Sequence, residues 1–204
     1  MTRRRHVLVA ALAGLAVSAC AVKPQSPTAE KAATPVVVVR EDVSARYIEF
    51  IGPKILYAEP FLGVPDTNYF ALRSWLDKRT GVVTHQLYVS ESYVGARRTW
   101  QSARDGKGDP LPIAAIGNHK IACRPSCSYT DDFAATLPDA LLRGSPGGLA
   151  VTFVAQGGSL KTIAVPAEVV QVELATIDTW RRRLEPVKTA STASPAPDRR
   201  PSSR

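Results

Sequence analysis

The stretch FALRSWLDKRTGVVTHQLYV, residues 70–89, decides the fold class of this chain. Apolar and polar side chains alternate in its first half, where one face carries Phe70, Leu72 and Leu76. Its second half alternates in the same way, and one face there carries Val83, Leu87 and Val89. The segment between them, Lys78-Arg79-Thr80-Gly81, has the composition of a turn. Two alternating runs joined by a turn predict a β-hairpin, which we expect to span residues 70–93.

The same signals continue on both sides of this hairpin. Further strands are expected at 36–39, 47–51, 54–58, 98–103, 111–123, 128–136, 149–155 and 160–165. From Pro166 to Leu184 the apolar residues take helical spacing, which favours a helix, although Val170–Leu174 also alternates like a strand. The expected fold class is therefore α+β: a β-rich antiparallel sheet or sandwich built of hairpins, with a C-terminal helix.

Composition and charge limit the classes of function. The chain has 204 residues, of which 45% are hydrophobic and 22% charged, which is typical of one globular domain. Its net charge of +8 lies at the ends, in Arg3-Arg4-Arg5 and in residues 181–204, whereas acidic and basic residues balance in 20–180. A nucleic-acid binder needs basic residues on a docking face of the fold, so we expect no nucleic-acid partner.

The N-terminal residues MTRRRHVLVAALAGLAVSAC, numbered 1–20, are typical of a secretory signal. Three arginines precede an apolar stretch, Val7–Val17, which is too short to span a bilayer comfortably as a permanent helix. No other apolar run in the chain is long, which excludes a protein with several membrane spans. Arg4-Arg5 leaves twin-arginine export open beside the general route.

The end of this signal, Val17-Ser18-Ala19-Cys20, resembles the lipobox of bacterial lipoproteins. The resemblance implies that the signal is removed before Cys20 and that the thiol is diacylated, so that lipid holds the protein in the cell envelope, facing the periplasm. It also implies that Ala21 favours the outer membrane, because Asp at that position would favour the inner one. Two or three acyl chains make a stable membrane anchor. An ordinary signal peptide with a chance cysteine is the alternative.

Four segments are expected along the chain. They are a lipoprotein signal peptide at 1–19, a lipidated Cys20 with a flexible tether at 20–44, a single β-rich domain at 45–184, and a disordered basic tail at 185–204. The tail is either an inert solubilising segment or a cationic arm for anionic envelope surfaces.

The domain is also similar to a group of uncharacterised envelope proteins. The shared features are Ser102-Ala103 before a glycine turn, Leu111-Pro112, Cys123 and Cys127 followed by Tyr129, and Val165-Pro166-Ala167. This resemblance implies an envelope protein and no particular activity.

Cys123 and Cys127 remain once Cys20 carries lipid. An exported compartment is oxidising, so the pair predicts a disulfide across a hairpin turn. A redox-active pair, free thiols and metal ligands are the alternatives, although the redox motif has two intervening residues instead of three. In a strand, His119 and Cys123 lie about 13 Å apart, too far to share one zinc ion, and we expect no metal and no cofactor.

Residues suited to acid–base chemistry are scattered. His85 shares its strand face with apolar neighbours, and His119 shares one with Ile113 and Ile121, so both are interpreted as hydrogen-bonded core or edge residues. Asp131 and Asp132 are adjacent and point to opposite faces, which favours a solvated acidic strand end over a catalytic pair. The chain has no phosphate loop and no dinucleotide fingerprint.

Two classes of function therefore remain. The first is a non-catalytic envelope lipoprotein, a module that binds an unknown envelope protein or ligand. The second is an envelope hydrolase that uses Asp131, Asp132, Glu91 or His119. An enzyme should place one of these residues beside a second titratable group in a cleft, whereas a binding module should expose an edge strand or an apolar patch.

The lipobox resemblance gives the first prediction. The Cys20→Ser variant should carry no acyl chains and should lose the specific cleavage before residue 20, because the thiol is the acceptor of the lipid. Mass spectrometry of the mature N-terminus checks both points. An unmodified mature terminus at another position in the wild-type protein would contradict the prediction.

Overall fold

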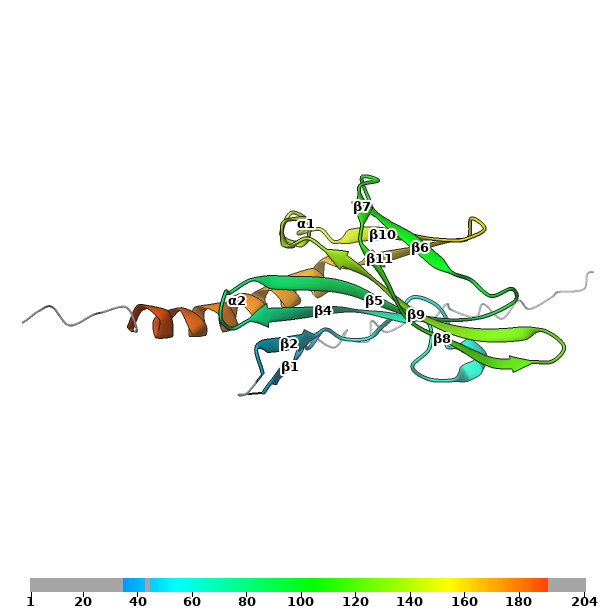
Figure 1. The fold of residues 1–204 in the computed structure, drawn as a ribbon, viewed down its shortest axis with the longest axis horizontal. Coiled ribbons are helices and arrows are strands. Elements are labelled where there is room, and N and C mark those ends of the chain that lie inside the picture. The colour runs from blue at the N-terminus through cyan, green and yellow to red at the C-terminus, as the bar shows by residue number, and fades with distance from the viewer. Residues whose placement is uncertain (1–34, 43–44, 191–204) are drawn as a thin grey trace, which may run out of the picture. The chain divides into compact units, whose positions relative to one another are not determined.

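A computed structural model describes residues 35–42 and 45–190, with the side chains of the last helix described as far as Leu184. Two antiparallel sheets and one long helix make up this domain (Figure 1). The larger sheet, called the long sheet here, has the order β1-β2-β4-β5-β9-β8, and a short β3 pairs with β4. Its strands are β1 (Val38–Glu41), β2 (Tyr47–Ile51), β3 (Ile55–Leu56), β4 (Tyr69–Asp77), β5 (Val83–Val94), β8 (Ile113–Cys123) and β9 (Cys127–Leu137).

The second sheet, called the short sheet, has the order β11-β10-β6-β7. Its strands are β6 (Trp100–Asp105), β7 (Pro110–Leu111), β10 (Leu149–Ala155) and β11 (Leu160–Val165). The helical elements are η1 (Phe61–Gly63), α1 (Asp139–Arg143) and α2 (Ala167–Ala190). The expected fold class, antiparallel sheets built of hairpins with a C-terminal helix, is confirmed.

The hairpin predicted from residues 70–93 forms as β4 and β5. Its register pairs Leu76 with Val83 next to the turn. Asp77 fixes this turn, because its Oδ1 accepts hydrogen bonds from the backbone N–H groups of Arg79, at 2.8 Å, and Thr80, at 3.1 Å. Gly81 completes the turn with φ +73°, a backbone conformation that glycine adopts without a steric cost.

The main core lies between the long sheet and the short sheet. Aromatic rings occupy its centre: Phe133 of β9 stacks on Trp100 of β6 at 4.5 Å between ring centroids and meets Phe153 of β10 edge-on at 4.9 Å. All three side chains are buried. The alternation read from the sequence therefore brings together the apolar faces of two sheets, as in other sheet-on-sheet packings.

Helix α2 covers the remaining part of the same face of the long sheet. Val170 and Ile177 of the helix are fully buried, and Ile177 packs in a second cluster with Ile48, Phe50 and Leu76. In Figure 1 the helix lies behind β4 and β5, so the viewer sees the face of these strands that is turned away from it. Val170 and Ile177 are seven positions apart, two helical turns, which matches the spacing predicted from the sequence.

The boundaries of the domain differ from those expected. Strand β1 lies within the stretch expected as a tether, because Val39 and Arg40 pair with Phe50 and Glu49 of β2. Helix α2 continues past Leu184 to Ala190. Residues 1–34, with the signal and Cys20, lie outside the described residues, as do 191–204. Within the described part, no helix is both long enough and apolar enough to cross a membrane.

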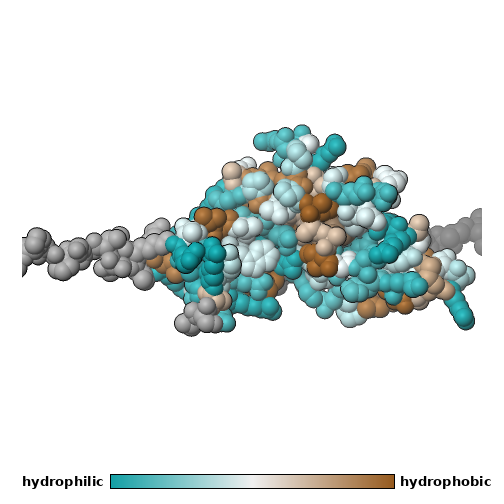
Figure 2. Space-filling model, in the orientation of Figure 1, coloured by the Kyte–Doolittle hydropathy of each residue, from teal (hydrophilic) through white to brown (hydrophobic). Residues whose placement is uncertain are grey.

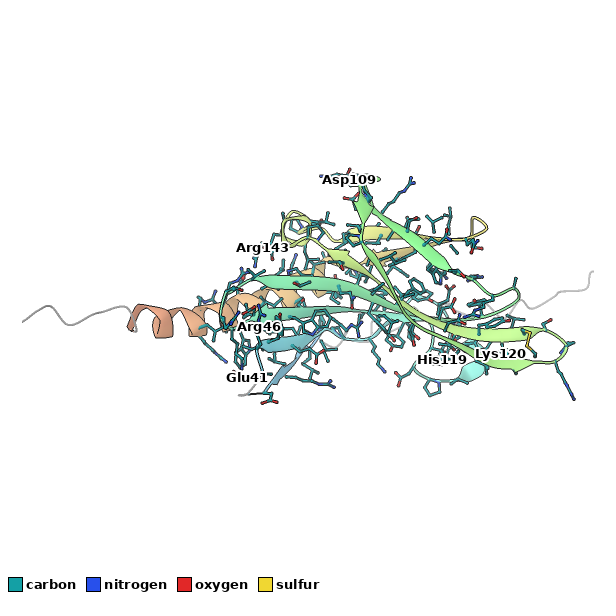
Figure 3. The ribbon with its side chains drawn as sticks, in the orientation of Figure 1. Glu41, Arg46, Asp109, His119, Lys120 and Arg143 are labelled. Carbon is teal, nitrogen blue, oxygen red and sulfur yellow. A yellow bond between two sulfur atoms is a disulfide. The ribbon has the colours of Figure 1, made fainter. Side chains whose placement is uncertain are left out.

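Strands β8 and β9 form a long hairpin that ends in the predicted disulfide. Cys123 and Cys127 are paired residues of this hairpin and are joined by a bond between their sulfur atoms, drawn in yellow in Figure 3. The hairpin extends away from helix α2 (Figure 1). Because Cys123 is exposed and the ring it closes is short, the disulfide restrains the end of the hairpin and leaves the core untouched.

Replacing both cysteines by serine should lower the free energy of unfolding by about 2 kcal/mol, the value expected for a ring this short, and should leave the fold intact. Denaturant unfolding with circular dichroism measures both. Reduction of the wild-type protein is the matched control and should give the same loss. Complete alkylation of both thiols in the folded, unreduced protein would contradict the disulfide.

Candidate functional site

Asp131 of β9 and Glu91 of β5 occupy directly paired positions in the long sheet. Their side chains lie on the face that carries the core, near the edge of the short sheet. Asp131 is 2% exposed and Glu91 is 4% exposed. The expectation that Asp131 belongs to a solvated strand end is therefore wrong for this residue: β6 covers it, because Trp100 packs on this face. Asp132 points to the opposite face, as predicted.

Three donors satisfy the buried Asp131 carboxyl. The Tyr93 hydroxyl donates to Oδ2 at 2.9 Å and the Trp100 indole N–H donates to the same oxygen at 3.2 Å. The Asn118 amide donates to Oδ1. Burial raises the pKa of Asp131, and the three hydrogen bonds oppose that rise. A carboxylate has about four acceptor positions, so one position on Oδ1 has no donor among the described residues.

Glu91 is held by two cations from different parts of the chain. Arg98 Nη1 lies 3.0 Å from its Oε1, and Lys161 Nζ of β11 lies 2.8 Å from the same oxygen. The Arg98 guanidinium also lies 4.1 Å from the centroid of the Tyr93 ring. Burial raises the pKa of Tyr93 to about 12, so this hydroxyl remains a hydrogen-bond donor at neutral pH.

A pocket of about 140 Å³ opens beside these groups and is called the Asp131 pocket here. It is lined by Arg97, Arg98, Thr99, Trp100, Ala115, Gly117, Asn118, Asp131, Asp132 and Phe133. Arg97 is exposed, and within the described ranges its guanidinium has no hydrogen-bond or ion-pair partner. The pocket thus combines a nearly buried carboxylate with a free cation.

His119 does not join this site on the face expected for it. The register of β8 against β9 shifts between Ala115 and Gly117, so a β-bulge reverses the alternation that the sequence indicates. As a result Ile113 pairs with Ala135, whereas His119 pairs with Thr130, on the opposite face. His119 is exposed on the β8–β9 hairpin (Figure 3).

The bulge also places His119 near Asp132. A Cβ atom at Gly117 would lie 3.1 Å from His119 Nε2 and 3.3 Å from Asp132 Oδ2, so glycine leaves room for both side chains. Two such groups do not make a metal site by themselves. Across residues 35–42 and 45–190, no three His, Cys, Asp or Glu side chains come close enough to hold a metal ion.

A second polar cluster lies under helix α2 and includes His85. Its Nδ1 is 2.8 Å from Ser74 Oγ, and its Nε2 is 2.9 Å from Asp139 Oδ1. These three residue types also make up catalytic triads, but Ser74 and His85 are completely buried and out of reach of a substrate. His85 is a hydrogen-bonded core residue, as its apolar strand face predicted.

The sequence contains a local signal for this second cluster. Ser74 interrupts the apolar face of β4 at the position that pairs with His85 once the turn at Gly81 sets the register. Two polar side chains facing each other in an apolar surface predict a buried hydrogen bond.

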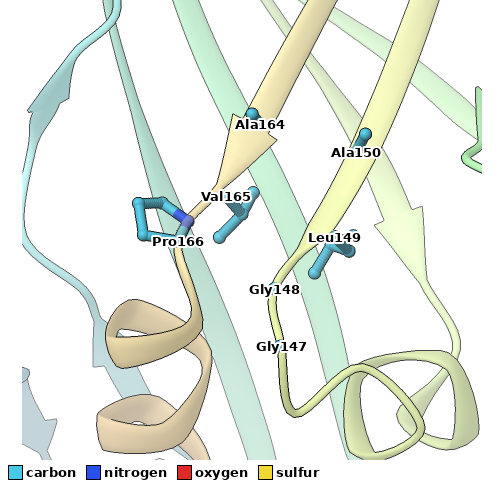
Figure 4. Close-up of a pocket in the computed structure, with 7 residues that line it drawn as sticks. All are labelled: Gly147, Gly148, Leu149, Ala150, Ala164, Val165 and Pro166. Carbon is cyan, nitrogen blue, oxygen red and sulfur yellow. The ribbon is translucent and has the colours of Figure 1, made fainter.

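Among the described residues, the other pockets do not combine a buried carboxylate with a cation. Figure 4 shows a shallow pocket of about 370 Å³ between β10, β11 and the start of α2. It is lined by Gly147, Gly148, Leu149, Ala150, Ala164, Val165 and Pro166, none of which ionises.

Hydrophobic residues on the face shown in Figure 2 form separate patches among hydrophilic ones. Ile116 and Ile121 of β8, which lies at the edge of the long sheet, are 48% and 53% exposed.

The chain matches no protein-family model, no curated protein and no solved structure.

The hydrogen bonds to Asp131 predict a large effect on stability. The Asp131→Ala variant leaves two buried donors and the half-buried Asn118 amide without an acceptor, so its free energy of unfolding should fall by about 3 kcal/mol or more. Denaturant unfolding measures the change. The matched control is Asp109→Ala, at an exposed aspartate in the β6–β7 turn (Figure 3), which should change stability by less than about 0.5 kcal/mol. Equal effects of the two variants would refute this account of the site.

Proposed function

We propose that this protein is a lipid-anchored, non-catalytic binding module of the bacterial cell envelope, and that the Asp131 pocket receives a small polar group of its ligand. The observation that carries the proposal is a pocket-lining carboxyl that is almost fully buried and yet has one acceptor position free. A ligand N–H or O–H that donates to this remaining position of a carboxylate forms a charge-assisted hydrogen bond and gains affinity there.

The lipid anchor rests on the sequence. Three arginines, an apolar stretch and Val17-Ser18-Ala19-Cys20 follow one another in the order of a lipoprotein signal. Cys20 lies fifteen residues before the first described residue, Pro35, so a chain segment is present between the lipid and the domain. The membrane is thus the first partner proposed, reached through lipid, with the domain facing the periplasm and the outer membrane favoured over the inner one.

Size and charge indicate the chemistry of the ligand group. A volume of about 140 Å³ admits a small polar group and excludes a bulky one. Asp131 requires an N–H or O–H donor, and the free Arg97 guanidinium favours a carboxylate or phosphate oxygen. A zwitterionic amino acid group carries both an ammonium and a carboxylate within this size. We therefore propose an α-amino acid group with its ammonium and its carboxylate both free, either as a free amino acid or attached to an envelope polymer through its side chain.

An envelope hydrolase is the second candidate, because Glu91 and Asp131 occupy directly paired positions and hydrolases use paired carboxyls. The contacts of both groups favour binding instead. Arg98 and Lys161 hold only Oε1 of Glu91, and hydrogen bonds hold both oxygens of Asp131. Glu91 Oε2 has no hydrogen-bond partner among the described residues, but Glu91 does not line the Asp131 pocket, so the two carboxyls do not face one bond of a substrate together.

A titration with free alanine tests the pocket. The indole N–H resonance of Trp100 in the NMR spectrum should shift as alanine binds, because this group donates to Asp131 in the pocket. N-acetylalanine lacks the ammonium and alanine amide lacks the carboxylate, so both should leave the resonance in place. Arg97→Ala should weaken alanine binding about tenfold, the effect of one charge-assisted hydrogen bond.

The matched control is Arg104→Ala, at an exposed arginine of β6 that does not line the pocket, and it should bind alanine like the wild type. Equal responses to alanine and its two blocked analogues would refute the proposed ligand chemistry. Chemical turnover of any of these probes would favour the hydrolase.

A further inference from the structure

Helix α2 carries a buried carboxyl, Glu173, that takes no part in the Asp131 pocket. Glu173 is 0% exposed and sits between Val170 and Ile177 on the buried face of the helix. Its Oε1 lies 2.7 Å from Ser74 Oγ of β4, whereas Oε2 has no hydrogen-bond partner among the described residues. Ser74 Oγ lies in turn 2.8 Å from His85 Nδ1. Glu173, Ser74 and His85 thus form one continuous chain, called the Glu173 chain here, which ends on Asp139.

Counting hydrogens determines how much protonation this chain needs. It contains three contacts, Glu173–Ser74, Ser74–His85 and His85–Asp139, and each contact requires one hydrogen. The serine hydroxyl supplies one hydrogen and a neutral imidazole supplies a second. The third must come from a further proton on the Glu173 carboxyl, on the imidazole as a cation, or on Asp139, whose pKa is lowered by the hydrogen bonds from His85 and Arg143 so that it stays ionised. Without that proton, one contact would bring two lone pairs together.

The two possible positions of the proton are related through Ser74. In one arrangement protonated Glu173 donates to Ser74, which donates to His85, and the imidazole donates to Asp139. In the other the same proton lies on His85 Nδ1, which donates to Ser74, and Ser74 donates to the Glu173 carboxylate, while the ring Nε2–H still donates to Asp139. Both arrangements hold the same number of protons, and only the first leaves the two buried groups without charge.

Burial favours the neutral arrangement at both ends. Burial raises the pKa of Glu173 to about 7, although the hydrogen bond with Ser74 lowers it. Burial also lowers the pKa of His85, although its hydrogen bond and ion pair with Asp139 raise it. At Asp139 burial opposes ionisation, but the hydrogen bonds from His85 and Arg143 outweigh it and lower the pKa, so this carboxylate accepts.

The charges around the chain balance one another. On the α1 side, Asp139 is bonded to Arg143 at 3.0 Å, and Arg143 is bonded to Asp178 of α2 at 2.7 Å. Arg143 and Arg181 both disfavour a cation on His85. From β4 only the Ser74 hydroxyl faces Glu173, and the backbone at Gly52 lies beside its Oε2. No charge within the described ranges acts on the Glu173 carboxyl.

We propose that Glu173 and His85 hold a single proton between them through Ser74, and that this neutral unit keeps helix α2 docked on the long sheet independently of pH in mildly acidic surroundings. The inference concerns the scaffold of the domain and does not depend on the Asp131 pocket or on the lipid anchor.

Proton counting in the folded and unfolded states gives the pH dependence. From about pH 4.5 to about pH 6.5, the ordinary pKa values of the two groups, the unfolded chain carries an ionised Glu173 and a cationic His85. The folded chain carries a protonated Glu173 and a neutral His85. Each state has one proton on the pair, so unfolding neither releases nor takes up a proton there, and stability does not change with pH.

Each group alone would behave differently. The raised pKa of Glu173 contributes stability that is fully present below about pH 4.5 and is lost as the pH rises through about 7. The lowered pKa of His85 contributes stability that is present above about pH 6.5 and is lost as the pH falls toward the folded value. In the window between, the two slopes have equal size and opposite sign.

Denaturant unfolding of the full-length chain in a non-ionic detergent, measured from pH 5 to 6.5, tests the inference. Relative to wild type, Glu173→Gln should raise the unfolding equilibrium constant about tenfold for each unit that the pH is lowered. The glutamine amide replaces the protonated carboxyl as a donor to Ser74, so this variant should fold. His85→Gln should show the opposite slope, and the double variant should again show none.

Two further measurements complete the experiment. Glu168→Gln, at an exposed glutamate in the first turn of the same helix, is the matched control and should follow the wild-type profile. In the wild-type protein at pH 6, the NMR shifts of the Glu173 carboxyl carbon and the His85 ring nitrogens should identify a protonated acid and a neutral imidazole. This readout serves even where His85→Gln does not fold. Slopes of the same sign for both single variants, or an ionised Glu173 at pH 6, would overturn the inference.

Discussion

The structure depends on the burial of one face of the long sheet. Strands β4, β5 and β9 present a largely apolar surface on that side, and the register of the hairpins sets which residues pair in it. The short sheet covers one part of the surface through Trp100, Phe133 and Phe153, and helix α2 covers the other through Ile177. Burying such large side chains supplies about 1.5–3 kcal/mol each, so this face determines where both covering elements must lie.

Polar side chains interrupt this face of the long sheet at two places, one under helix α2 and the other beside the short sheet. Ser74 and His85 lie where helix α2 covers the sheet, and Glu91 and Asp131 lie where β6 begins. A buried carboxylate without partners would cost several kcal/mol, so each cluster needs its own compensation. Asp131 is compensated by donors from three different elements. In the arrangement we infer, Glu173 is compensated by keeping its proton.

Local patterns predicted most of the fold. Alternation in residues 70–89 and the turn at Gly81 were enough for β4 and β5, and helical spacing after Pro166 was enough for α2. The β-branched run at 36–39 predicts a strand, but it falls in the stretch expected as a tether, and its pairing with β2 could not be identified from composition. The bulge in β8 reversed the face of His119, because one extra residue shifts every later side chain in a strand.

The site was harder to predict than the fold because its residues come together only in three dimensions. Glu91 and Asp131 are forty positions apart, and Glu173 and Ser74 are ninety-nine positions apart. Two adjacent aspartates suggest a solvated strand end until the position of Trp100 is known. The lipid anchor differs from the pocket, because its motif consists of consecutive residues that the sequence alone shows. The anchor remains a prediction, since these residues lie outside the described part of the chain.

The two carboxyls respond differently to pH, and this difference matches their proposed roles. Glu173 is linked to a base, His85, through a hydroxyl, so a proton lost by one group in the unfolded state is gained by the other. Asp131 has no such base among its hydrogen-bond partners, which are a phenol, an indole and an amide. Burial raises the pKa of Asp131, and a ligand that donates to it favours its ionised form. The scaffold is thus balanced against pH, whereas the proposed ligand contact titrates.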